Sequence, residues 1–352
     1  MDVRLPVKHR RPGVCYAVTD DGVELPVVDI TSTEFPVGVA ADELDAFAAD
    51  SLRFMDRWAK VPGGMRRLLA RRSHLMREAA ASGTGFMTGM ATYLNKLGPD
   101  NLGDWATGTD RRAAAMLPAV AVRVRLRQVA RLVADAIAAL PAAESAADRT
   151  VHLVNLGGGT AVDSLNALLL LAAERPDALA GCSFAVEVLD LGREGPDFGA
   201  RALAALQAPG APLAGVDASL RFHGYDWSRA GDLPEVLTDA GVPADGTPAV
   251  VSSEGGLFEY AGDDDVVANL RALGEACPSG TVVVGSAFRE TAVVTTMRRM
   301  SGMTFVSRSP ERLDELGSPG GWHVDRLLEG NPVYHVFTLA RAHVSPAARR
   351  VH

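Results

Sequence analysis

Residues 151–164 read VHLVNLGGGTAVDS, an apolar run that stops at three consecutive glycines. Such a run, bounded by glycine, predicts a buried strand that ends in a tight turn. In a parallel α/β sheet ligands bind at the carboxyl ends of the strands, and glycine there lets the backbone approach a ligand closely. Gly157, Gly158 and Gly159 are placed for that role, although a turn that only joins strand to helix is the alternative.

Two common phosphate-binding motifs do not fit this turn. The dinucleotide fingerprint G-x-G-x-x-G needs a third glycine at position 162, which is Val162. The loop G-x-x-x-x-G-K-[ST] needs a glycine–lysine pair, and none follows. The sequence therefore weakens the case for a pyrophosphate site and excludes the second kind of loop.

Composition limits the class of partner. The chain has 352 residues, 47% of them hydrophobic, which is enough for a sizeable core. Its net charge of -8 comes from acidic and basic residues mixed along the chain, which argues against nucleic acid or an anionic membrane as partner. A small molecule or a protein is the expected partner. The longest apolar run, 167–173, is too short to span a bilayer.

The N-terminus and the cysteines favour a cytoplasmic protein without a metal centre. The chain does not open on a charged segment followed by an apolar stretch and a cleavage site. Cys15, Cys182 and Cys277 are widely spaced and form no Cys-x-x-Cys pair. Neither a disulfide framework nor a thiolate metal site is therefore expected.

Residues 1–145 are predicted to form a separate N-terminal region. Residues 13–30 alternate apolar and polar side chains on both sides of Asp21-Gly22, which predicts a β-hairpin. Residues 41–140 show the helical spacing of apolar positions. Between those helices, 82–105 is rich in glycine and is expected to contain a loop that folds over a ligand, and 141–150 reads as a linker.

Over residues 146–352 strands and helices alternate, which is typical of an α/β domain. The last two predicted strands are joined only by Gly330-Asn331-Pro332, which is too short for a helical crossover and predicts an antiparallel hairpin. We predict a doubly wound, seven-stranded, mostly parallel sheet. Its strands are expected at 151–156, 183–191, 219–226, 248–254, 281–288, 322–329 and 333–342.

Carboxylates stand at the ends of the second and third strands of this series. Asp190 can accept hydrogen bonds from both hydroxyls of a ribose. Asp226 can meet the amino group of an adenine beside the apolar plane of Trp227. Either aspartate could instead cap the following helix, but their spacing on successive strands favours a nucleoside site.

The order of these segments resembles the class I S-adenosylmethionine-dependent methyltransferases over about residues 145–345. The segments that carry the resemblance are VNLGGGTA, EVLDL, FHGYDW, VVSSEGGLFEY, TVVVGSAF, SPERLDELGSPGGWHVDRL and VYHVFTLARA. The resemblance implies a doubly wound sheet that binds S-adenosylmethionine across its first three strand ends. The residues implied as cofactor contacts are Gly157, Gly158 and Gly159 at the methionine part, Asp190 and Leu191 at the ribose, Asp226 and Trp227 at the adenine, and Ser253. The stretch from the glycines to Asp190 is somewhat long, which leaves Glu187 as an alternative at the ribose.

Three residues are candidates for the chemistry. Methyl transfer from a sulfonium is an in-line displacement that chiefly needs alignment, so a base is optional. Glu254 is the first ionisable group after the fourth strand and could bind the acceptor, accept its proton or simply cap a turn. His223 could face the ligand or bond within the sheet, and Tyr93 could donate a hydrogen bond or belong to the core.

The predicted function is methyl transfer to a small-molecule acceptor, such as a specialised metabolite, whose reacting atom is oxygen, nitrogen or an aromatic carbon. An NAD(P)-dependent oxidoreductase would share the glycine turn but not the terminal hairpin. A non-catalytic protein that keeps the fold is the other alternative. The apolar N-terminal helices also suggest a homodimer.

Overall fold

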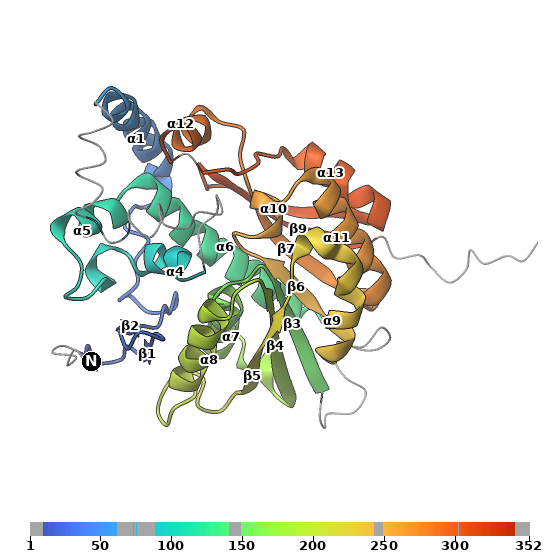
Figure 1. The fold of residues 1–352 in the computed structure, drawn as a ribbon. Coiled ribbons are helices and arrows are strands. Elements are labelled where there is room, and N and C mark those ends of the chain that lie inside the picture. The colour runs from blue at the N-terminus through green and yellow to red at the C-terminus, as the bar shows by residue number, and fades with distance from the viewer. Residues whose placement is uncertain are drawn as a thin grey trace, which may run out of the picture.

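The computed structural model describes residues 10–61, 73, 75, 89–140, 149–242, 249–301 and 303–341. Within them the main sheet has seven strands in the order β5-β4-β3-β6-β7-β9-β8 (Figure 1). All neighbours are parallel except at the end of the sheet, where β9 is antiparallel to both β7 and β8. The strands are β3 (Arg149–Leu156), β4 (Cys182–Asp190), β5 (Asp217–Gly224), β6 (Val250–Ser253), β7 (Val282–Phe288), β8 (Trp322–Leu328) and β9 (Tyr334–Arg341). The predicted fold class is confirmed.

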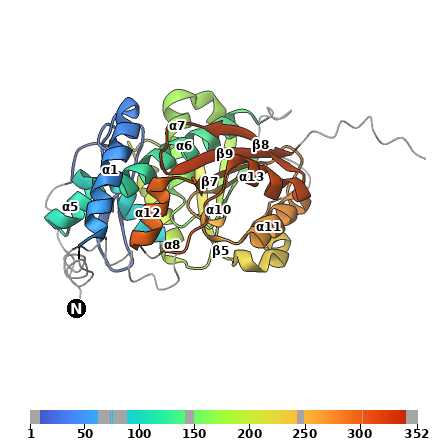
Figure 2. The ribbon, with the colours of Figure 1, turned by 90° about the horizontal axis from the view of Figure 1, so that it is seen from above.

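Helices cover both faces of the sheet (Figures 1 and 2). One face carries α6 (Leu117–Ala138), α7 (Val162–Glu174) and α8 (Glu194–Leu206). The other carries α9 (Leu233–Asp239), α10 (Leu257–Tyr260), α11 (Asp263–Ala276) and α13 (Pro310–Gly317). The apolar side chains accordingly form two large buried clusters, which is the layered packing that a parallel sheet requires.

The N-terminal hairpin lies against α8. Strands β1 (Tyr16–Val18) and β2 (Glu24–Pro26) pair antiparallel around a turn in which Gly22 has a φ of 84°, so the predicted hairpin is confirmed. The helices that follow are α1 (Leu44–Ala59), α4 (Gly89–Leu97) and α5 (Gly108–Ala114). Helix α5 begins at a capping box in which Thr107 and Asp110 satisfy each other's backbone N–H groups.

Helix α6 joins the N-terminal region to the sheet. It packs on α7 and on strands β6, β7 and β9, although it lies before the predicted boundary at residue 145. The last two residues of the predicted linker at 141–150, Arg149 and Thr150, belong to β3 and pair with Cys182 and Ser183 in β4, whereas 141–148 lie outside the described residues. The division into two domains stays a prediction.

Helix α12 and the terminal hairpin complete the described fold. Helix α12 (Ala292–Ser301) follows β7 in the chain, precedes α13 and packs against α1. The terminal hairpin is held by Asn331, whose Oδ1 accepts from the backbone N–H of Val333 and of Tyr334 at 3.1 Å. Among the described residues, no helix combines the length and the apolar character needed to cross a membrane.

Candidate functional site

A cavity of about 310 Å³ opens at the carboxyl ends of β3, β4, β5 and β6. This is the edge of the sheet at which the sequence predicts a ligand. Strand ends, the start of α8 and helix α4 of the N-terminal region all contribute to its wall. The lining residues are Gly89, Met90, Thr92, Lys96, Gly157, Gly158, Gly159, Thr160, Leu189, Asp190, Leu191, Gly192, Glu194, Gly195, Pro196, Tyr225, Trp227, Glu254, Gly255, Gly256 and Tyr260.

The three glycines present bare backbone to the cavity. Gly157 and Gly159 have φ values of 65° and 52°, a region that side chains with a Cβ rarely adopt. A Cβ on Gly157 would lie 2.8 Å from the Cζ3 atom of Trp227, and one on Gly159 would lie 2.8 Å from the Cα atom of Gly89. Any larger residue at Gly157 or Gly159 would therefore collide with the surrounding chain, and we call residues 157–159 the glycine cradle.

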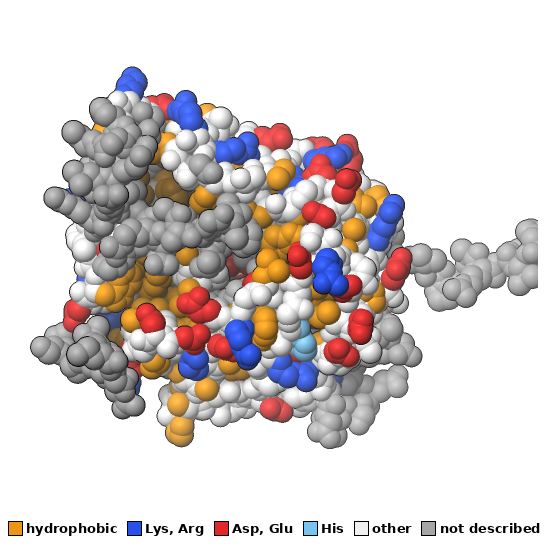
Figure 3. Space-filling view, viewed as in Figure 1, with side chains coloured by type: hydrophobic (Ala, Val, Ile, Leu, Met, Phe, Trp, Pro, Cys, Tyr) orange, Lys and Arg blue, Asp and Glu red, His pale blue; other side chains and the backbone are white. Residues whose placement is uncertain are grey.

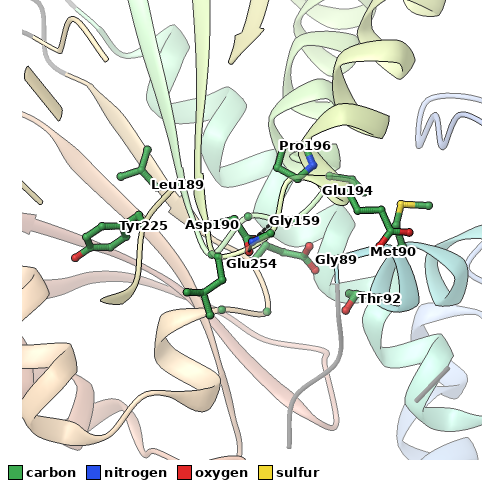
Figure 4. A pocket seen from close by; sticks show the side chains of 18 of the residues that line it. Gly89, Met90, Thr92, Gly159, Leu189, Asp190, Glu194, Pro196, Tyr225 and Glu254 are labelled. Atoms are coloured by element: carbon green, nitrogen blue, oxygen red, sulfur yellow. Dashed lines mark hydrogen bonds between the residues drawn. The ribbon is translucent and has the colours of Figure 1, made fainter. Parts of the chain in front are cut away.

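Asp190 braces this loop across the sheet. Its Oδ2 atom accepts a hydrogen bond of 2.9 Å from the backbone N–H of Gly159, as the dashed line in Figure 4 shows. Burial raises the pKa of Asp190, and the backbone N–H groups of Gly159 and Gly192 offset only part of that rise. Beside it Leu191 is 57% exposed, so an apolar side chain faces solvent at the cavity mouth.

The end of β5 contributes two aromatic rings. Trp227 lines the cavity, and so does Tyr225, which the sequence analysis did not single out. The Tyr225 hydroxyl donates to Asn269 at 2.6 Å, which holds the ring in place. Asp226 is not among the lining residues, because its carboxylate caps the next turn by accepting from the N–H and hydroxyl of Ser228 at 2.9 and 2.8 Å.

Ser253 stabilises the backbone next to the cavity. Its hydroxyl donates to the carbonyl of Leu156 at 2.8 Å and accepts from the N–H of Leu257 at 2.9 Å. It is buried and does not line the cavity. Its geometry fixes the turn that carries the next residue, Glu254, into the cavity wall.

Glu254 is held between two cations that the sequence analysis missed. Its Oε1 atom accepts from Nε of Arg125 at 2.6 Å, and its Oε2 atom accepts from the ammonium of Lys96. Burial raises the pKa of Glu254, but the charges of Arg125 and Lys96 outweigh burial and hold the pKa below its ordinary value. A carboxylate that stays ionised in this way is a poor proton acceptor and a good positioning group.

Arg125 extends this cluster into the core. Its Nη1 atom donates to both oxygens of Glu259 at 2.8 and 2.9 Å, and its guanidinium lies over the ring of Tyr334 at 4.5 Å. Glu259 also accepts from the hydroxyl of Ser286 at 2.7 Å. The sequence signal that could have revealed this cluster is Arg125 itself, an arginine on the face of α6 that otherwise carries buried apolar residues. The abundance of arginine in the whole chain hides that signal.

Two predicted catalytic residues lie outside the cavity wall. The Tyr93 hydroxyl donates to the carbonyl of Pro26 at 2.7 Å and accepts from the N–H of Val28 at 3.1 Å, so it anchors the N-terminal hairpin. His223 bonds through Nε2 to the buried carboxylate of Glu187 at 2.7 Å. Because Glu187 bonds to His223 and does not line the cavity, Asp190 is the better candidate for the carboxylate at the ribose.

The region expected to be a lid is partly helical. The stretch 82–105 was expected to contain a loop; residues 82–88 of it lie outside the described residues, and Gly89–Leu97 forms α4. Helix α4 supplies Met90, Thr92 and Lys96 to the cavity wall. Gly89 makes this possible because its backbone approaches that of Gly159 more closely than a side chain would permit.

The described part of the chain contains no candidate metal site, and its surface charges are mixed. No group of three or more histidine, cysteine, aspartate or glutamate side chains there could hold a metal ion. On the face in Figure 3, acidic and basic side chains are interspersed over the described residues.

Comparison with known proteins supports the fold alone. No family model and no curated protein matches the chain. Among solved structures, a possible exported protein from Bordetella parapertussis is similar over 86% of this chain and 98% of its own, with 16% identity and a TM-score of 0.52. The mitomycin 7-O-methyltransferase MmcR is 19% identical over 92% of this chain and 80% of its own, with a TM-score of 0.40. The pyocyanin biosynthetic protein PhzM is 20% identical over 66% of this chain and 58% of its own, with a TM-score of 0.39.

The strand order of the sheet agrees with the resemblance found in the sequence. Strand β3 lies next to β4 on one side and β6 on the other, and β9 is inserted antiparallel between β7 and β8. This is the mostly parallel sheet with an antiparallel terminal hairpin that the resemblance predicted. The chain has a Rossmann-like fold whose mostly parallel, seven-stranded sheet ends in an antiparallel hairpin.

Proposed function

We propose that the protein is an S-adenosylmethionine-dependent methyltransferase that acts on a small molecule. The observation that carries the proposal is the glycine cradle itself: Gly157 and Gly159 leave bare backbone beside Trp227, and Asp190 braces it. The cavity volume of about 310 Å³ is at the lower end of the usual range of small-molecule sites, ~300–1,000 Å³.

The residues present fit the chemical parts of this cofactor. Asp190 has a carboxylate oxygen, Oδ1, that can accept from a ribose hydroxyl while Oδ2 holds Gly159. Tyr225 and Trp227 provide the aromatic surface for an adenine, and Figure 4 places Tyr225 to one side of Asp190. S-Adenosylmethionine, when bound, supplies a methyl group that is already activated for displacement.

The chain contributes alignment and exclusion of water. Glu254 is held ionised by Arg125 and Lys96, so it orients polar groups and does not remove a proton. Met90 from α4 and Pro196 from α8 give the far wall an apolar surface on which an acceptor can rest. Alignment of this kind is the main contribution that a methyl transfer requires of a protein.

The oxidoreductase alternative is less well supported. The dinucleotide fingerprint requires a small residue where Val162 begins α7, and the Val162 side chain is buried there. The antiparallel hairpin of β8 and β9 also argues against an oxidoreductase, which was not expected to have a terminal hairpin.

Isothermal titration tests the proposal. We expect the wild-type protein to bind S-adenosylmethionine and S-adenosylhomocysteine, and NAD⁺ not to compete with either. Asp190→Ala should weaken binding about tenfold to a hundredfold, because it removes a charged acceptor and the brace on Gly159. Asp226→Ala is the matched control, since its carboxylate caps a turn. No binding by folded wild-type protein would overturn the proposal.

Two parts of the proposal concern the protein as a whole. We propose a cytoplasmic location and a homodimer formed through the N-terminal helices. Light scattering on the purified protein tests the second point, and a monomeric mass at micromolar concentration would contradict it.

A further inference from the structure

Lys96 is a buried cation with bonding capacity left over. It lies on α4, is 4% exposed and lines the cavity. An ammonium has three N–H donors. Among the described residues, its hydrogen-bond partner is Glu254 alone. Buried donors without acceptors are costly, so the cavity is where the remaining donors must find theirs.

The charges around Lys96 compensate its positive charge but leave some of its hydrogen-bond donors unused. Glu254 is already bonded to Arg125 through its other oxygen, and Arg125 is shared with Glu259. The cluster thus has two cations and two carboxyl groups, and the charge of Lys96 stays compensated when no ligand is bound. Lys96 is the member of the four that lies on the cavity wall and still has donors to offer.

The position of Lys96 separates it from the nucleoside side of the cavity. In Figure 4 Tyr225 lies on one side of Asp190, and Thr92 and Met90 of α4 lie on the other, with Glu254 between them. Lys96 is one helical turn beyond Thr92 on the same face of α4. An adenosine placed on Tyr225 and Asp190 would therefore leave Lys96 to whatever occupies the α4 side.

We propose that Lys96 binds an anionic oxygen of a ligand, a carboxylate or a phenolate, and that Glu254 and Arg125 position its ammonium for this. The inference rests on the proposed function for the identity of the first ligand. Two sources could supply the oxygen: the carboxylate of the cofactor's methionine part, or an ionised carboxyl or phenol of the acceptor. In the second case the acceptor would react through oxygen: an O–CH₃ bond forms as the S–CH₃ bond breaks, giving a neutral thioether. The acceptor's proton has by then been lost to solvent.

The test compares wild-type protein with Lys96→Met, whose unbranched side chain is one atom shorter and carries no charge. Lys96→Gln covers the case in which the methionine variant does not fold, since its amide can still donate to Glu254. Lys60→Met, at an exposed lysine just beyond α1, is the matched control. Circular dichroism melts first establish that each variant is folded.

Titrations then separate the two sources of the oxygen. The first arm measures S-adenosylhomocysteine, which carries the amino acid part, against 5′-methylthioadenosine, which lacks it. The second arm measures benzoate and 4-nitrophenolate on protein saturated with S-adenosylhomocysteine. Loss of a hydrogen bond to a charged group predicts a drop of about tenfold or more in one arm, with Lys60→Met unchanged in both.

Each result decides the inference. A drop for S-adenosylhomocysteine but not for 5′-methylthioadenosine assigns Lys96 to the cofactor's carboxylate. An unchanged first arm with lost anion binding in the second assigns it to the acceptor. If both variants match wild type within about twofold in both arms, the inference is wrong while the proposed function stands. If wild-type protein itself fails to bind S-adenosylhomocysteine, the proposed function fails and the inference with it.

Discussion

The two sides of the cavity are built in different ways. On the β4–β5 side, Gly159, Asp190 and Trp227 stand at the ends of successive segments, and each is placed by the strand that precedes it. On the α4 side, Glu254 meets Lys96 and Arg125, which are 158 and 129 residues away in the chain. The first side depends on local backbone geometry, whereas the second depends on buried charges contributed by distant elements.

This difference predicts different costs of mutation. Local backbone geometry can be strained without exposing a charge, so a change there should affect ligand binding first. A buried charge cluster leaves an uncompensated charge when one member is removed, so a change there should affect folding first.

The largest effect is expected at Arg125. Arg125→Met leaves Glu254 and Glu259 buried without their shared cation and should lower the free energy of unfolding by about 3–5 kcal/mol. Arg131→Met is the control on the same helix, because its pair with Glu174 is about half exposed and worth about 1 kcal/mol or less. Urea unfolding measures both. Equal losses would show that burial of the Arg125 cluster adds nothing.

A smaller effect is expected at the glycine cradle. Gly159→Ala forces a Cβ to within 2.8 Å of the Gly89 backbone at a φ of 52°, which should cost about 1–3 kcal/mol of stability and weaken S-adenosylhomocysteine binding. Gly192→Ala lies in the same cavity wall, but its Cβ would meet open space. Calorimetric titration of both variants compares them, and similar affinities would remove the argument for a cradle.

The pH dependence of stability should report on Glu254. Its pKa in the folded protein is below the ordinary value of 4.5, so its contribution is present above pH 4.5 and is lost as the pH falls through the folded value. The difference in unfolding free energy between wild type and Glu254→Gln should therefore be largest near neutral pH and shrink in acid. Urea titrations at several pH values measure it. A difference that grows in acid would contradict the assigned direction.

The smallest effect is expected at Tyr93. Tyr93→Phe removes the hydrogen bonds to Pro26 and Val28 and should cost about 1–2 kcal/mol of stability, because the buried carbonyl and N–H lose their partner. Affinity for S-adenosylhomocysteine should not change, since Tyr93 does not line the cavity. A fall in affinity without a fall in stability would contradict this prediction and indicate that Tyr93 takes part in ligand binding.

Much of the fold followed from local signals. The hairpin around Asp21-Gly22, the alternation of strands and helices, and the antiparallel pair around Asn331 all depend on residues close together in the chain. The helix at Gly89–Leu97 was not singled out within the stretch expected to contain a loop, because glycine near a helix start resembles glycine in a turn. Gly89 is present for a contact with Gly159 that the sequence pattern does not reveal.

The candidate site divides in the same way. The predicted residues that line the cavity are Gly157, Gly158, Gly159, Asp190, Leu191, Trp227 and Glu254, and their role toward a ligand stays a prediction. Asp226, Ser253, Tyr93 and His223 make hydrogen bonds that hold other elements. Residue type and spacing could not separate these groups, because a carboxylate or hydroxyl at a strand end can serve a ligand or a backbone N–H equally well.

The strand ends could be predicted from short stretches of sequence, because alternation, glycine turns and helix spacing act over a few residues. Which charges meet depends on the packing of distant elements, because Lys96, Arg125 and Glu254 come from α4, α6 and the end of β6. A buried charge pairs with whichever opposite charge the fold places within bonding distance, and this distance in space cannot be inferred from the separation of the two residues along the chain.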